Sequence, residues 1–237
     1  MRVRALALAL LVAAAGCARP APRLPPEPRP TIADRVAQVG PAARARLRPW
    51  FAAAGVPYPP ARFLLLGLKH EGELQLYAAG AGQPLRFVRA FAVHGASGGL
   101  GPKLRAGDRQ VPEGIYAITY LNPRSIAHLS LALDYPNDFD RARAAEDGRD
   151  AATLGGDIMI HGGAGSIGCL AMGDQAAEDL FVLAADSDWP RAVVVISPVD
   201  FRTAELPAGY QMPAPWVREL YVRLRLELYG LPLPAGE

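Results

Sequence analysis

The segment HGGAGSIGC, residues 161–169, contains the two side chains in the sequence that are best suited to nucleophilic catalysis. His161 begins the segment and Cys169 ends it. A thiol with the ordinary pKa of about 8.5 is mostly protonated at neutral pH, so it reacts faster when a base accepts its proton. An imidazole within hydrogen-bond reach can accept that proton and return it to a leaving amine. The pair is therefore a candidate for acyl transfer.

The residues between this pair are mostly glycine, which favours close approach of backbone to substrate. Small residues beside a nucleophile let backbone N–H groups converge on a developing oxyanion. A neutral catalytic imidazole also needs a partner that holds its tautomer. Because no Asp or Glu occurs between residues 158 and 173, we expect a backbone carbonyl to do this.

The N-terminal residues 1–17 have the pattern of a signal peptide. Arg2 and Arg4 precede an apolar stretch of eleven residues, 5–15, which is too short to span a bilayer. The stretch leads to Gly16-Cys17, which is similar to a bacterial lipobox and makes Cys17 the expected lipidation site. An ordinary cleaved signal and an uncleaved anchor are the alternatives. Since the residue after Cys17 is not Asp, we expect an outer-membrane lipoprotein in the periplasm of a Gram-negative bacterium, with no other membrane contact.

Export of this kind leaves Cys169 as the only free thiol, because the sequence has two cysteines. One alternative is an inert buried thiol. A second is a metal site built from histidines, which occur at positions 70, 94, 128 and 161. A structural zinc site needs four ligands, and the mature chain has no second cysteine to offer. We therefore expect no metal and no cofactor.

Composition limits the class of protein further. The 237 residues are 51% hydrophobic and carry a formal net charge of +2, without a run of five basic residues. This argues against nucleic-acid binding and fits one medium domain with appendages.

Turn residues and hydrophobic periodicity divide the chain into a linker, a helical segment and a mostly β region. Residues 18–30 are proline-rich and predict an extended linker. Residues 31–61 predict a helical segment that begins at Thr31 as N-cap and breaks near Gly40-Pro41. Strands are expected at 62–68, 73–78, 84–95, 115–121, 125–134, 156–160 and 191–197. Helices are expected at 174–186, capped by Asp174, and at 215–230. The fold class predicted is α+β, mostly β, without the βαβ alternation of a Rossmann fold.

Three stretches carry a family resemblance. IMIHGGAGSIGCLAM (158–172) resembles the signature of the L,D-transpeptidase catalytic domain of YkuD type. SGGLGPKLRAGDRQVPEGIYAI (97–118) and HLSLALDYPNDFDR (128–141) resemble its YafK-like branch. The resemblance implies a catalytic domain over residues 62–202, with a YkuD-like β-sandwich or mixed sheet and flanking helices. Residues 203–237, with the terminal amphipathic helix, lie outside it.

The resemblance also implies roles for single residues. Cys169 would form a thioester with a peptidoglycan stem peptide, and His161 would move the proton. Gly168 and Cys169 would supply oxyanion N–H groups, and Ser166 would shape the loop. We expect His128, Arg109, Gly162 and Gly163 to bind substrate. A solvated or hydrogen-bonded strand histidine is an alternative at least as good for His128, and Arg109 could instead hold its loop. Asp108 and Gln110 would contact substrate or hold their loop, whereas Lys103 and Arg105 are expected on a solvated face.

The acyl acceptor is left open by one departure from the family pattern. Many members carry arginine two residues after the cysteine, where this chain has Ala171. An amine acceptor would give cross-links, as in an L,D-transpeptidase of cell-wall biogenesis. Water would give an L,D-carboxypeptidase, or a hydrolase that releases a murein-bound outer-membrane lipoprotein. A non-catalytic lipoprotein that tethers peptidoglycan is the third alternative.

Overall fold

The computed structural model describes residues 29–234. The predicted signal segment, Cys17 and most of the predicted linker lie outside this range, so their predictions stay predictions. Within the described range, no helix is both long and apolar enough to cross a lipid bilayer.

The centre of the fold is a mixed sheet of eight strands in the order β3-β2-β1-β8-β4-β5-β6-β7. Only the pairs β1–β8 and β6–β7 are parallel. The strands are β1 Arg62–Leu68, β2 Glu73–Ala79, β3 Arg86–Ala92, β4 Gly114–Asn122, β5 Ser130–Leu133, β6 Met159–His161, β7 Leu170–Ala171 and β8 Val193–Ser197.

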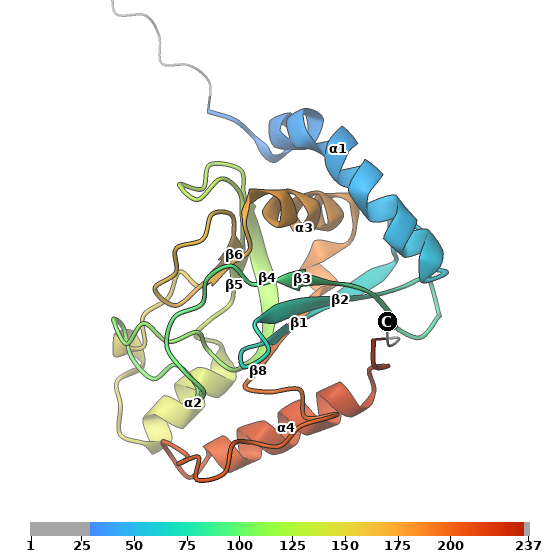
Figure 1. The fold of residues 1–237 in the computed structure, drawn as a ribbon. Helices are drawn as coiled ribbons and strands as arrows, with labels where there is room; N and C mark the ends of the chain where they lie inside the picture. The colour runs from blue at the N-terminus through green and yellow to red at the C-terminus, as the bar shows by residue number, and fades with distance from the viewer. Residues whose placement is uncertain (1–28, 235–237) are drawn as a thin grey trace, which may run out of the picture.

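Helices cover both faces of this sheet. They are α1 Ile32–Ala53, α2 Asp138–Glu146, α3 Asp174–Asp186 and α4 Val217–Tyr229, with short 3₁₀ helices at Ala151–Thr153 and Trp189–Arg191. In Figure 1, α1 and α3 lie together over one face and α4 lies across the other. Alternate residues of β1 face the two layers: Leu65 packs in the core that includes α3, whereas Leu64 packs with α4. Burial on both faces explains why β1 is a continuous apolar run. The expected α+β class, with a mixed sheet and flanking helices, is confirmed.

The predicted break in the first helix is wrong. Thr31 caps the helix as expected, in a reciprocal capping box with Asp34, but α1 continues through Gly40 and Pro41. Packing against α3 accounts for the continuity: Arg44 forms two hydrogen bonds to Asp186, of 2.7 and 2.6 Å. Tertiary contacts therefore outweigh the local preference of the Gly-Pro pair.

Two other predicted elements need correction near the motif. The strand expected at 125–134 begins only at Ser130, and His128 lies in the preceding turn with a φ of 70°. The N-cap of α3 is Gly173 rather than Asp174. The Asp174 carboxylate instead accepts a hydrogen bond of 2.8 Å from the Gly163 N–H, so it holds the glycine loop to the start of the helix.

Candidate active site

Strands β6 and β7 bring the two ends of the HGGAGSIGC segment side by side. Their parallel register pairs Ile160 with Leu170 and His161 with Ala171. Side chains alternate along a strand, so Cys169, two residues before Ala171, is expected on the same face as His161. Cys169 and His161 are offset by two residues along the strand direction and lie on neighbouring strands. This corresponds to about 8 Å between their Cα atoms. The intervening loop thus returns the thiol to the strand that carries the imidazole.

His161 is buried at the end of β6, with one ring nitrogen already engaged. Its Nδ1 lies 2.6 Å from the carbonyl oxygen of Gly162. Because a carbonyl accepts, Nδ1 is the donor of this hydrogen bond, and in the neutral form of the ring the lone pair then lies on Nε2. The expectation that a backbone carbonyl holds the imidazole is confirmed, and the resulting tautomer can accept a proton at Nε2.

The Cys169 thiol is partly buried, and its hydrogen-bond contacts are to the backbone. The Met159 N–H points at Sγ over 3.4 Å, and Sγ lies 3.5 Å from the Asp157 carbonyl oxygen. Burial, with the nearby Asp157 charge, raises the pKa of Cys169 above the usual thiol range; the Met159 N–H and the Lys103 charge act in the opposite direction. The resting side chain is therefore a neutral thiol, which needs a base to become a nucleophile.

This pKa direction predicts the pH dependence of alkylation. The rate of Cys169 modification by iodoacetamide should rise through pH 8 and keep rising above pH 9, because only the thiolate reacts and burial delays its formation. Intact-mass measurement of labelling at a series of pH values checks this. A plateau below pH 7 would instead indicate a preformed thiolate–imidazolium pair.

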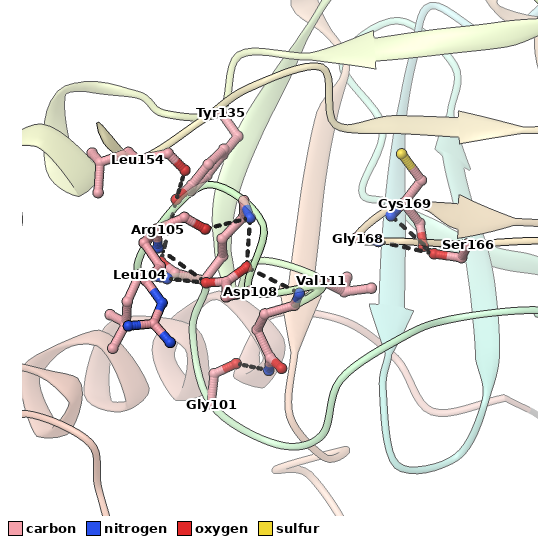
Figure 2. A network of polar contacts seen from close by, with 12 residues as sticks. Gly101, Leu104, Arg105, Asp108, Val111, Tyr135, Leu154, Ser166, Gly168 and Cys169 are labelled. Atoms are coloured by element: carbon pink, nitrogen blue, oxygen red, sulfur yellow. Dashed lines mark hydrogen bonds and ion pairs between the residues drawn. The ribbon is translucent and has the colours of Figure 1, made fainter. Parts of the chain in front are cut away.

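Ser166 organises the turn that precedes the thiol. Its Oγ accepts hydrogen bonds from the N–H groups of Gly168 (3.2 Å) and Cys169 (3.0 Å), and donates to the Cys169 carbonyl (2.7 Å). Figure 2 shows these contacts, with the sulfur directed away from the serine. The two N–H groups predicted to bind the oxyanion are thus occupied by Ser166 in this state. An oxyanion would have to displace the hydroxyl, so the oxyanion role of Gly168 stays a prediction.

A cavity of about 460 Å³ opens beside Cys169. Its wall includes two of the predicted site residues, Gly168 and Arg109, and the 79%-exposed side chain of Ile167 lies at its edge. The remaining lining residues are Lys103, Ala106, Gly107, Gly155, Gly156, Asp157 and Ile158. Cys169 is therefore part of the cavity wall.

The prediction that Lys103 lies on a solvated face is wrong. It is only 7% exposed, and its ammonium donates to Asp108 (2.6 Å) and to the Arg105 carbonyl (2.8 Å). Arg105 itself is exposed, as expected. A signal was present in the sequence: Lys103 and Lys69 are the only lysines in a chain whose other cations are arginines, and both are buried in ion pairs. Asp157 and Ile167 carried no comparable signal.

Asp108 and Gln110 hold the loop that forms one side of the cavity. The Asp108 carboxylate accepts from the N–H groups of Leu104 (2.9 Å), Arg105 (3.0 Å) and Gln110 (3.1 Å), as Figure 2 shows. The Gln110 amide donates to the carbonyls of Gly99 and Gly101. Of the two roles considered for these residues, their contacts are those of loop-holding groups.

The other predicted substrate-binding residues lie outside the cavity wall. His128 Nε2 lies 3.0 Å from the Glu178 carboxylate of α3. A Cβ at Gly162 would come within 2.6 Å of Asp174, so this glycine is required by packing. Gly163 has a φ of 69° and binds Asp174 through its N–H. The structure thus places Arg109 and Gly168 in the cavity wall with Cys169, whereas His128, Gly162 and Gly163 do not line the cavity.

Gly95 is a supporting residue that the sequence did not reveal. Its backbone pairs with Ala171, and a Cβ there would lie 2.0 Å from the carbonyl oxygen of Ala164 in the glycine loop. Only glycine allows this approach. Across residues 29–234, no three His, Cys, Asp or Glu side chains group in a way that could hold a metal ion.

Comparison with known proteins shows the same family over the same region. Residues 69–196, more than half of the chain, match the model of YkuD, the L,D-transpeptidase catalytic domain. Two curated relatives from Escherichia coli, strains K12 and O157:H7, each named "Putative L,D-transpeptidase YafK", are 36% identical over 115 residues. That match covers 48% of this chain and 43% of each relative, so the chain spans less than half of their length.

Two solved structures are similar at lower identity. The helical cell shape determining protein Pgp2 from Campylobacter jejuni is 22% identical with a TM-score of 0.44, over 64% of this chain and 55% of that protein. Bd1075 from Bdellovibrio bacteriovorus is 17% identical with a TM-score of 0.42, over 60% and 50%. On the match of its central region, the chain belongs to the YkuD family of L,D-transpeptidase catalytic domains.

Proposed function

We propose that this protein is a cysteine acyltransferase that acts on peptidoglycan stem peptides. Family membership supports the substrate class. The observation that carries the mechanism is the placement of Cys169 in the cavity wall, next to a strand that ends in His161 with Nδ1 held and Nε2 available.

The reaction proceeds in two halves. His161 Nε2 accepts the thiol proton while Sγ attacks the carbonyl carbon that follows the L-centre of a diamino acid. The C–N bond breaks, the proton passes from the imidazole to the leaving amine of D-alanine, and a thioester remains on Cys169. An amine then attacks the thioester, its proton returns to the thiolate through His161, and a new amide is formed.

Hydrolysis is the alternative that one observation favours. Residue 171, two positions after the nucleophile, is a buried alanine, so the chain has no guanidinium at this position. Without that group to bind an acceptor carboxylate, water becomes the competing acceptor. The product is then a trimmed stem, or a lipoprotein released from peptidoglycan.

Intact-mass spectrometry after incubation with a carbapenem tests the nucleophile, because a strained lactam acylates an activated thiol. We expect one covalent adduct on the wild-type protein and none on Cys169→Ala. Circular dichroism serves to show that the variant is folded. An adduct that persists in Cys169→Ala, or a folded wild type that forms none, would refute the proposal.

Purified stem peptides with and without an amine acceptor separate the two outcomes. Cross-linked products support transfer, whereas shortened stems alone support hydrolysis.

The periplasmic location and the lipid anchor at Cys17 are part of the same proposal, and they rest on the N-terminal sequence.

A further inference from the structure

The peptide unit that joins Gly162 to Gly163 is hydrogen-bonded at both of its ends. Its carbonyl oxygen, on Gly162, lies 2.6 Å from Nδ1 of His161. Its N–H, on Gly163, donates to Oδ1 of Asp174 over 2.8 Å. Because the C=O and N–H of a trans peptide point in opposite directions, the two hydrogen bonds link the carboxylate to the imidazole in one chain. Such linked hydrogen bonds polarise and strengthen one another.

The backbone around this peptide unit places Asp174 opposite the glycine loop. The carbonyls of His161 and Gly163 accept from the N–H groups of Met172 and Gly173, each over 2.8 Å. These bonds continue the pairing of β6 with β7 beyond the last residues of both strands. Asp174 is the next residue and the first of α3, so its position relative to the loop is fixed by main-chain hydrogen bonds.

The two glycines that follow His161 allow the carboxylate to approach the peptide unit. A Cβ on Gly162 would lie 2.6 Å from Oδ1 of Asp174 and 2.8 Å from the Ala127 carbonyl oxygen. Gly163 has a φ of 69°, which glycine adopts at little cost. Larger residues at these two positions would therefore push the carboxylate away or strain the backbone.

The chain ends at the ring nitrogen that decides the tautomer of His161. A general base needs its lone pair on Nε2, so the proton of the neutral ring must stay on Nδ1. In a triad this is the task of an acidic side chain in direct contact with the ring. Here Nδ1 meets a carbonyl, and the acidic side chain lies one peptide unit further away.

We propose that Asp174 is a positioning residue for His161, and that it holds the Gly162–Gly163 peptide so that the imidazole keeps its proton on Nδ1 and its lone pair on Nε2. This rests on the proposed function, in which Nε2 accepts the thiol proton. The proton on Nδ1 stays there during the reaction, and none passes to Asp174. Because Asp174 is exposed, its role depends on the position of its oxygen more than on its charge.

The tautomer of His161 tests this inference without turnover. In protein with ¹⁵N-labelled histidine, the nitrogen chemical shifts distinguish a protonated from an unprotonated ring nitrogen, and His161→Ala identifies the signal. At a pH where the ring is neutral, we expect the Nδ1–H form alone in the wild type and in Asp174→Asn, because asparagine keeps an acceptor oxygen for the Gly163 N–H. In Asp174→Ala the Nε2–H form should appear as well.

Steady-state kinetics with a stem peptide gives a second measurement. In Asp174→Ala we expect kcat to fall about tenfold, the value of one charge-assisted hydrogen bond. KM should stay within about threefold, since Asp174 does not line the Cys169 cavity. Asp174→Asn should return kcat to within about threefold of the wild type. Asp138→Ala is the matched control, because Asp138 is the exposed first residue of α2, and it should change neither constant.

The results separate this inference from the proposed function. A wild-type ring protonated on Nε2, or an Asp174→Ala protein that is folded by circular dichroism and keeps the wild-type tautomer, would overturn the inference even if the carbapenem adduct forms. So would a kinetic loss confined to KM, or one that Asp174→Asn does not restore. A tautomer change in Asp174→Ala that Asp174→Asn reverses supports it, even if the wild type forms no adduct.

Discussion

Replacing His161 with alanine is expected to lower kcat/KM for stem-peptide cleavage by about 10²- to 10⁴-fold, the usual value of a positioned general acid–base. The resting thiol is neutral because burial raises its pKa, so the uncatalysed supply of thiolate at pH 7 is small. His161 Nε2 is the expected proton acceptor, since Nδ1 is bound to the Gly162 carbonyl. Steady-state kinetics with a purified muropeptide measures the loss.

The pH profile distinguishes this role from a structural one. In His161→Ala the remaining rate should rise with pH, because hydroxide then generates the thiolate that the imidazole no longer provides. His70→Ala is the control, since His70 is an exposed residue of the turn between β1 and β2. A variant that keeps its activity to within threefold at pH 7 would show that His161 is not the base.

Replacing Glu113 with alanine is expected to lower the free energy of unfolding by about 3 to 5 kcal/mol, the usual cost of leaving a buried charge without its partner. Glu113 is 0% exposed. One carboxylate oxygen accepts from Lys69 (3.0 Å) and the Gly101 N–H (2.6 Å), and the other accepts from Tyr221 (2.8 Å). Its loss would leave the buried Lys69 ammonium without its negatively charged partner. Burial already lowers the pKa of Lys69.

Urea denaturation followed by circular dichroism measures this effect. Glu205→Ala, which removes an exposed ion pair with Arg225, should leave the midpoint nearly unchanged. Because Glu113 joins the 97–113 loop to α4, its variant should also lose order in the loop that lines the Cys169 cavity. A destabilisation equal to that of Glu205→Ala would contradict the expected role.

The elements that bury one continuous face could be predicted from the sequence. The terminal helix shows this: the spacing placed Val217, Leu220, Tyr221, Leu224 and Leu228 inward, and all five are buried. The apolar runs that became β1 and β8 were equally clear, because strands buried on both faces need apolar residues at every position. The strand that ends in His161 was also found, since it leads directly into the motif.

Elements decided by non-local contacts were missed. The continuity of α1 depends on Asp186, 142 residues away from Arg44. Helix α2 was not predicted, although Asn137 and Asp140 form its capping box, because a short polar helix has almost no apolar periodicity. Hydrophobic periodicity likewise predicted too long a strand for β5, because it does not reveal the left-handed backbone turn at His128.

The candidate site was predicted in part for the same reason. The local string identified Cys169, His161 and Ser166, whose side-chain hydrogen bonds all lie within the 157–169 segment. The cavity wall instead depends on the 97–113 loop, whose shape follows from hydrogen bonds to Asp108. Lys103 was therefore misplaced on the surface, and the partner of His128, Glu178 of α3, could not be read from the local sequence.

The position of β8 has a consequence for how the polypeptide reaches this structure. It is the last strand to be synthesised, yet it lies between β1 and β4. Until residues 193–197 pair, the β3-β2-β1 meander and the β4–β7 half have no common border, and each presents an unpaired apolar edge. Pairing of β8 with β1 must then close a long loop of chain, which slows folding and leaves the partly folded polypeptide exposed to aggregation. A holding chaperone would be most valuable to this protein in the interval before β8 enters the sheet.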